Sequence, residues 1–228
     1  MKQLGVIGGL GPETGCTFCL TINNKVIAKT RIQPNIVMEN VPIPETVLHR
    51  LAKGEKPMEV LALLSKSITR LNIIGSDIIA IPCNTVHVFI DQLRSISKIP
   101  IISIIEESAK ECQRIGSKRV FVLASTTSIK EKLHANELLK RKINFIVPND
   151  KQQKKLSEII VSIVTNRVTH KDKTELISIM KDAKNRGADS IMLACTDLRT
   201  IISGSEIDIP IIETTSVLED SVAQAIME

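Results

Sequence analysis

The 228-residue chain contains no tryptophan, no tyrosine and only four phenylalanines. Proteins that bind nucleic acids commonly combine stacking aromatic side chains with clustered basic residues. In this sequence the basic residues are scattered, apart from a cluster at 151–155, and the net charge is only +5. We therefore expect no nucleic-acid partner. Because 43% of the residues are hydrophobic and few are aromatic, the core should be built from aliphatic side chains.

Long apolar runs are missing as well, since no stretch approaches the roughly 18 residues that a membrane-spanning helix needs. The start of the chain passes into an apolar run and a glycine-rich turn without a cleavable signal pattern. We therefore expect no membrane partner. The five cysteines are odd in number, which favours reduced thiols and a cytoplasmic location.

Two of these cysteines, Cys16 and Cys19, have the spacing of a redox or metal-binding pair. They fall within an expected helix, and neither a second pair nor a nearby histidine completes a zinc site. We interpret them as small buried side chains and predict no metal centre.

The sequence contains an internal repeat. Residues 77–85 (DIIAIPCNT) and 189–197 (DSIMLACTD) both begin with the aspartate of a Gly-x-Asp pattern. Both continue with an apolar run that is followed by a cysteine. Cys83 and Cys195 are 112 positions apart, and two further pairs of segments match at nearly the same offset, 99–102 with 209–212 and 2–10 with 118–126. Three matching landmarks in register predict a tandem pair of similar units.

Strand-like and helix-like segments alternate along both units. Residues 4–7 and 36–41 read as strands, and residues 57–73 have apolar side chains at helical spacing. The alternation predicts an α/β fold of two similar domains from an internal duplication, each a mainly parallel sheet flanked by helices, with the active site in the cleft between them. We expect the first domain at 1–98 plus 210–228 and the second at 99–209.

The candidate site residues follow expected strands, where parallel sheets bind ligands. The turn at 8–13 (GGLGPE) brings backbone N–H groups of Gly9 and Gly11 near an anion and leads into a helix, with Pro12 and Glu13 in its first turn. It lacks the full dinucleotide-binding spacing.

The two repeated cysteines suit acid–base chemistry at carbon. A thiolate that removes a proton, facing a thiol that returns one, inverts a stereocentre. Each cysteine precedes a helix-like segment, which predicts a lowered thiol pKa. Asn84, Thr85 and Thr196 can donate hydrogen bonds to a substrate carboxylate.

Four motifs resemble those of the aspartate/glutamate racemase family. They are GGLGPE at 8–13, PCNTVH at 82–87, LASTTS at 123–128 and ACTDL at 194–198, in the order found in that family. The resemblance implies a cofactor-independent amino-acid racemase, without pyridoxal phosphate, that forms a homodimer and acts on a small amino acid, aspartate first and glutamate or a broader range as alternatives. It makes Cys83 and Cys195 the two bases. The residues it implies for substrate binding are Gly9, Gly11, Thr46, Asn84, Thr85, Ser125, Ser128, Thr196, Asp197, Arg50 and Arg167.

The sequence departs from the family pattern at several of these positions. Thr46 stands where aspartate-specific members have an arginine for the side-chain carboxylate, so Arg50 or Arg167 would have to replace it. Asp197 stands where the family has a glutamate that reaches the ammonium group. Two alternatives stay open: a cysteine-nucleophile isomerase of an unsaturated dicarboxylate, similar to maleate isomerases, and a catalytically silent carboxylate-binding protein.

The histidines are expected to contribute little to the site. His87 follows Cys83 by one turn, where it either tunes the thiol or serves the core. His49, His134 and His170 lie in polar surroundings of the sequence, and we predict that all three lie on the surface.

Overall fold

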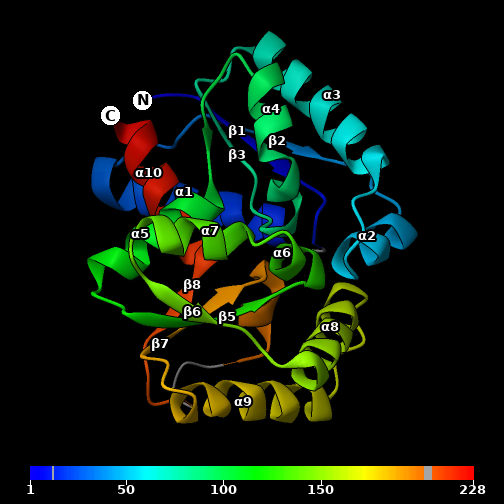
Figure 1. Cartoon of the computed structure of the whole chain (residues 1–228). Coiled ribbons are helices and arrows are strands. Elements are labelled where there is room, and N and C mark those ends of the chain that lie inside the picture. Colours follow the sequence, from blue (N-terminus) through cyan, green and yellow to red (C-terminus); the bar gives the residue numbers. More distant parts are fainter. Residues whose placement is uncertain (12, 203–206) are drawn as a thin grey trace.

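A computed structural model describes residues 1–11, 13–202 and 207–228. Pro12, expected in the first turn of a helix, lies outside the described residues. The described residues form two four-stranded sheets in which all strand pairs are parallel (Figure 1). Helices flank both sheets, which confirms the expected α/β class.

The first sheet has the strand order β2-β1-β3-β4. In chain order its half contains β1 (Leu4–Gly8), α1 (Thr14–Thr30), β2 (Ile36–Asn40), α2 (Glu45–Ala52), α3 (Met58–Ile74), β3 (Ile78–Ala80), the 3₁₀ helix η1 (Thr85–Phe89), α4 (Ile90–Ile96), β4 (Ile101–Ile102) and α5 (Ile104–Arg114).

The second sheet has the order β6-β5-β7-β8, which repeats the first. Its half contains β5 (Arg119–Ala124), α6 (Thr126–Lys130), α7 (Leu133–Lys140), β6 (Asn144–Ile146), α8 (Asp150–Val164), α9 (His170–Asn185), β7 (Ser190–Ala194), the 3₁₀ helix η2 (Thr196–Thr200), β8 (Ile211–Glu213) and α10 (Thr214–Met227). The identical strand order agrees with a duplicated unit.

The aspartates of the repeated Gly-x-Asp pattern have the same structural role in both halves. The backbone N–H of Gln3, just before β1, donates to Oδ2 of Asp77 at 2.7 Å. Likewise the N–H of Lys118, just before β5, donates to Oδ2 of Asp189 at 2.7 Å. Each carboxylate therefore fixes the start of one central strand against the start of its neighbour, β3 or β7.

Sheet membership departs from the expected domain boundaries at two strands. β4, expected in the second domain, pairs with β3 in the first sheet. β8, expected in the first domain, pairs with β7 in the second sheet. Each strand completes the sheet that precedes it in the chain, because consecutive elements tend to be neighbours. Helix α10 then packs on α1 and α5 (Figure 1), and the domain division itself stays a prediction.

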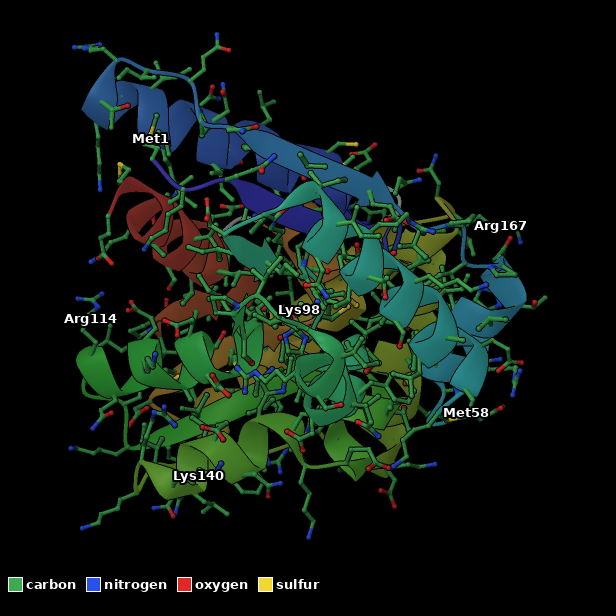
Figure 2. All side chains as sticks on the ribbon, turned by 90° about the horizontal axis from the view of Figure 1, so that it is seen from above. Met1, Met58, Lys98, Arg114, Lys140 and Arg167 are labelled. Atoms are coloured by element: carbon green, nitrogen blue, oxygen red, sulfur yellow. The ribbon has the colours of Figure 1, made fainter. Side chains whose placement is uncertain are left out.

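The core is aliphatic, as expected, and the central strands β1, β3 and β7 are buried at every position. Long charged side chains, among them those of Arg114 and Lys140, extend outward around the molecule (Figure 2). Within the described part of the chain, no helix combines the length and apolarity that crossing a bilayer requires.

Helices α2 and α8, which come from different halves, lie side by side at one edge of the molecule (Figure 1). The hydroxyl of Thr127 in α6 donates to the carbonyl of Leu51 in α2, and Nζ of Lys56 pairs with Glu131 at 2.8 Å. These contacts hold α2 against the second half and place it over the site described next.

Candidate active site

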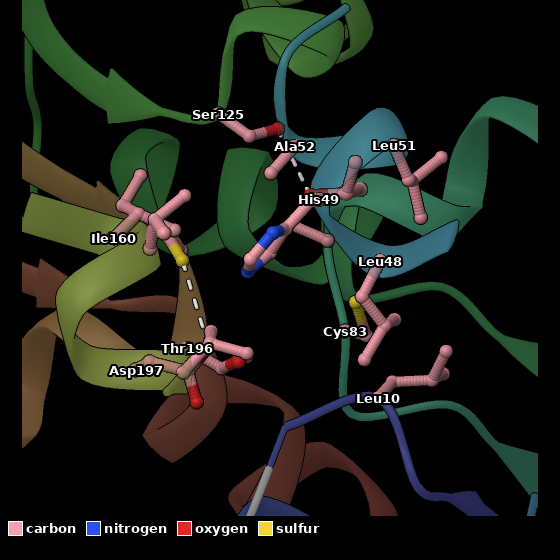
Figure 3. A pocket seen from close by; sticks show the side chains of 15 residues that line it. Leu10, Leu48, His49, Leu51, Ala52, Cys83, Ser125, Ile160, Thr196 and Asp197 are labelled. Carbon is pink, nitrogen blue, oxygen red and sulfur yellow. Dashed lines mark hydrogen bonds between the residues drawn. The ribbon is translucent and has the colours of Figure 1, made fainter. Parts of the chain in front are cut away.

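The two repeated cysteines line one pocket between the halves. Cys83 follows β3 and Cys195 follows β7, and both are buried, with exposed fractions of 9% and 8%. The pocket leaves about 40 Å³ in which the centre of a water molecule can lie. The residues that line it are Leu10, Leu48, His49, Leu51, Ala52, Cys83, Asn84, Thr85, Ser125, Ile160, Val161, Val164, Cys195, Thr196 and Asp197 (Figure 3).

A 3₁₀ helix begins close after each cysteine and supplies backbone N–H groups. Those of Thr85 and Val86 favour the Cys83 thiolate, and the N–H of Asp197 favours that of Cys195. Burial nevertheless outweighs these hydrogen bonds, because removing a thiolate from water is unfavourable. It raises the pKa of Cys83 to about 11 and that of Cys195 well above its usual value. The expectation of lowered thiol pKa values is therefore wrong.

The carboxylate of Asp197 couples the two thiols. Its Oδ1 accepts a hydrogen bond from the hydroxyl of Thr14 at 3.0 Å, and Sγ of Cys195 donates to its Oδ2 at 3.8 Å. After burial, its negative charge contributes to the raised pKa of both Cys195 and Cys83. A Cys83 thiolate also raises the pKa of Cys195. Since like charges disfavour a second ionisation, ionisation of one thiol opposes ionisation of the other.

A chain of buried hydrogen bonds fixes the amide of Asn84. The hydroxyl of Thr214 donates to the carbonyl of Leu193 at 2.9 Å, so its oxygen accepts from Nδ2 of Asn84 at 2.9 Å. The amide oxygen therefore points the other way, where Nε2–H of His134 donates to it at 3.0 Å. One Nδ2 hydrogen of Asn84 is used by Thr214, and the described residues offer the second no other acceptor. It is available to a ligand in the pocket.

A second hydrogen-bonded chain joins the halves through hydroxyl groups. Oγ1 of Thr85 lies 2.9 Å from Oγ of Ser125, which donates to Oγ of Ser128 at 3.1 Å. Ser125 also caps α6 by accepting from the N–H of Ser128 at 3.3 Å. Thr85 and Ser125 line the pocket, whereas Ser128 lies behind Ser125 and supports it.

The structure brings together seven of the residues expected at the site: Cys83, Asn84, Thr85, Ser125, Cys195, Thr196 and Asp197. The other expected residues do not line this pocket. Gly9, Gly11 and Arg167 line a neighbouring groove. Gly11 also packs on Asp197, because a Cβ at this glycine would lie 2.7 Å from Oδ1 of Asp197.

Two expected contacts to a substrate side chain face away from the pocket lining. Thr46 is exposed. Arg50 lies at the surface, where Nε donates to Glu55 at 2.7 Å and Nη1 to Glu59 at 3.2 Å. The guanidinium is thus held by two acids of its own half. Arg167 lies at the edge of the molecule (Figure 2).

Two histidines expected on the surface belong to the site instead. His134 is only 2% exposed, and its ring makes a buried hydrogen bond with Asn84. His49 extends from α2 into the pocket (Figure 3). His170 is exposed, as expected. His87 is buried, and burial lowers its pKa to about 4, although the hydrogen bond that its Nδ1–H donates to the carbonyl of Cys83 at 2.8 Å acts in the opposite direction.

Two residues of the site were not predicted from the sequence. Thr14 contacts Asp197 and Thr214 contacts Asn84. Thr214 follows the second IPII segment, and the repeat itself pointed to that segment.

The prediction that Cys16 and Cys19 are buried is wrong, since Cys16 is exposed and Cys19 is half-buried on α1. Among the described residues, no group of three or more histidine, cysteine, aspartate or glutamate side chains is placed to hold a metal ion.

Comparisons with known proteins agree with this architecture. A sequence profile described as Asp/Glu/Hydantoin racemase matches residues 7–221. The chain is 25% identical over 229 residues to the broad specificity amino-acid racemase RacX of Bacillus subtilis (strain 168), covering 96% of each protein.

Two solved structures share the fold over the whole chain. A putative Asp/Glu racemase from Yersinia pestis superposes with a TM-score of 0.85 at 20% identity and is covered completely. Picrophilus torridus aspartate racemase superposes with a TM-score of 0.82 at 22% identity, with 95% of that chain covered. The family match over nearly the whole length confirms the resemblance and the expectation of an isomerase. The chain belongs to the Asp/Glu/hydantoin racemase family.

Proposed function

We propose that this protein racemises a free amino acid by moving a proton between its two faces, with Cys83 and Cys195 as the two bases. The observation that carries the proposal is the shared pocket: two buried thiols from equivalent positions of a duplicated fold, each influenced by the charge of Asp197, with Cys83 also raising the pKa of Cys195.

The reaction is a proton exchange at Cα. One cysteine, as thiolate, takes the α-proton and becomes a thiol, while the electron pair passes into the carboxylate as an enediolate. The opposite cysteine, as thiol, gives its proton to the other face of Cα and becomes the thiolate. Atoms and charge balance, and the enzyme returns to its starting state when the reverse reaction follows or the thiols exchange protons with water.

The polar residues of the pocket can hold the amino acid for this step. The free N–H of Asn84 and the backbone of η1 suit the α-carboxylate, where negative charge grows in the transition state. The carboxylate of Asp197 suits the α-ammonium group, whose positive charge would offset the unfavourable burial of that acid. As part of the proposal, the thiols act without a cofactor. Aspartate, glutamate and a broader range of amino acids stay open as substrates at this step.

The test is α-proton exchange by NMR with the reduced protein in deuterated water, using L- and D-amino acids separately. The proposal predicts loss of the α-proton signal and appearance of the opposite enantiomer. Cys83→Ser and Cys195→Ser should each abolish racemisation, whereas Cys112→Ser, at a buried thiol away from the pocket, should retain it.

Two other results would replace the proposal. A covalent adduct at one cysteine with an unsaturated dicarboxylate would establish the nucleophilic isomerase. Stabilisation by small carboxylates without any exchange, in folded and reduced protein, would establish a binding protein.

We further propose a homodimer in a reducing compartment, the cytoplasm. The reaction requires free thiols, and all five cysteines are unpaired in the structure. Several large apolar side chains are exposed, with Ile73 the most at 79%. Light scattering that gives twice the chain mass of 25.1 kDa would support the dimer, and a mass equal to one chain would exclude it.

A further inference from the structure

We infer that the substrate's side chain is small and uncharged, and that the wall formed by α2 and α8 makes this choice. The inference rests on the proposed racemase function and specifies its substrate class. The pocket has two unlike faces.

One face of the pocket is polar and carries the groups that the reaction needs. Cys83, Asn84 and Thr85 come from the first half, and Cys195, Thr196 and Asp197 from the second. These residues follow β3 and β7, so they surround Cα, the carboxylate and the ammonium group. The substrate side chain must then point toward the remaining wall.

That wall is aliphatic. Leu48, Leu51 and Ala52 of α2 and Ile160, Val161 and Val164 of α8 line it, joined by Leu10. Figure 3 shows Ile160 on one side of the view and Leu48 and Leu51 on the other. A carboxylate or ammonium group placed against these side chains would lose its water without gaining a partner, which is strongly unfavourable.

No lysine or arginine lines the pocket in the described part of the chain. Arg50 is engaged by Glu55 and Glu59 at the surface, and Arg167 lines the neighbouring groove. The basic side chain that does line the pocket is His49, and its Nε2 lies 3.5 Å from Oε1 of Glu45. This Nε2 is buried and makes no hydrogen bond within the described residues, so it can contact a polar group of the substrate. The acid of Glu45 beside it disfavours a second carboxylate at the same place.

The available space limits the size of the side chain. The pocket holds about 40 Å³ of positions for water centres, and one water needs about 10–15 Å³ on this measure. Room for about three waters favours the amino acids with the smallest side chains, so alanine, serine, threonine and valine are the candidate substrates.

The experiment compares kcat/KM for α-proton exchange across matched amino acids. Alanine, serine, threonine and valine form the uncharged set, and aspartate, glutamate, lysine and arginine form the charged set. We expect the best uncharged substrate to exceed aspartate by about 100-fold or more, since the pocket leaves a carboxylate unpaired. Higher values for any charged amino acid would overturn the inference while leaving the racemase function intact. Absence of exchange with every amino acid, in folded and reduced protein, would overturn both.

A gain-of-function variant tests the wall itself. Val161→Arg places a guanidinium at a half-buried position of the lining and should raise the kcat/KM ratio of aspartate to alanine about tenfold or more. Ser162→Arg, on the same helix but outside the lining, is the matched control and should leave the ratio unchanged. Equal changes in both variants would contradict the assignment.

His49 and Arg167 are tested as the remaining sources of positive charge. The panel is repeated in His49→Gln and Arg167→Ala. The substrate ranking should persist in both variants. An aspartate preference that depends on either residue would assign the carboxylate contact to it and overturn the inference.

Discussion

The imidazole of His134 donates a hydrogen bond from Nε2 to the amide oxygen of Asn84, at 3.0 Å. The two residues come from different halves of the duplicated fold, and the amide nitrogen is bound on its other side by Thr214 at 2.9 Å. His134 and Thr214 together therefore fix the orientation of the Asn84 amide. We assign His134 as a positioning residue, since it acts through Asn84.

Replacing His134 with leucine should impair substrate binding and catalysis. Without the donor, the buried Asn84 oxygen is left unpaired and the amide can turn, with a loss of stability of about 1–3 kcal/mol. We expect kcat/KM for exchange to fall about 10-fold to 100-fold. His134→Gln, whose amide nitrogen can replace Nε2, should recover much of the activity. Equal activity losses in the leucine and glutamine variants would indicate a purely structural role.

The raised thiol pKa values predict a pH dependence. The pKa of Cys83 is about 11, because burial disfavours its thiolate, so neutral pH lies well below it. The thiolate fraction then increases about tenfold per pH unit below the pKa. We expect alkylation of Cys83 by iodoacetamide, followed by mass spectrometry, to accelerate continuously between about pH 7 and pH 9. The exposed Cys16 reports the reactivity of the reagent in the same sample. A Cys83 rate that is constant across this interval would contradict the assigned direction.

Asp197→Asn should lower the pKa of Cys195. Burial is the main cause of the raised value, and the charge of Asp197 is the next, so removing the charge relieves the second cause and leaves the first. At neutral pH, alkylation of Cys195 should become several-fold faster, while racemisation falls because the ammonium group loses its partner. Asp208→Asn, at an exposed acid, should change neither rate. Slower alkylation in Asp197→Asn would show that the carboxylate assists thiolate formation.

Gly11→Ala should separate activity from stability. An added Cβ would lie 2.7 Å from Oδ1 of Asp197 and 3.0 Å from Oγ1 of Thr14, so the carboxylate must shift. We expect exchange activity to fall about tenfold or more. Gly116→Ala is the matched control: it meets no atom within 4 Å but has a φ of +78°, so it should lower the melting temperature and retain activity. Full activity in Gly11→Ala would show that this close packing does not position Asp197.

The sequence could predict much of the fold and the reactive pair. Cys83 and Cys195 could be identified from the sequence because the duplication places them at equivalent strand ends. In a parallel sheet, ligands bind at the ends of strands. Asn84, Thr85 and Thr196 follow those cysteines directly in the sequence, so their position in the pocket could be predicted together with that of the cysteines. Local pattern and the repeat were sufficient for these residues.

The remaining features depend on tertiary packing that local pattern does not encode. His134 reads as a surface residue by its neighbours in the sequence, yet it is buried, and its hydrogen-bond partner Asn84 lies 50 positions away in the chain. The thiol pKa values were predicted in the wrong direction. The helical segment after each cysteine can be recognised from the local sequence, whereas the burial that raises the pKa depends on the packing of the whole fold. Arg50 was a candidate for a substrate carboxylate, but two nearby glutamates hold it at the surface.

The measurement that tests the central claim most directly is the order in which solvent deuterium enters the two enantiomers. The reduced protein is incubated in deuterated water with a single enantiomer of its best substrate, and both enantiomers are analysed by chiral mass spectrometry at early times. With Cys83 and Cys195 on opposite faces, the newly formed enantiomer should carry deuterium at Cα while the recovered starting enantiomer does not. Deuterium that enters both enantiomers at equal initial rates would show that one base serves both faces and would contradict the two-thiol mechanism.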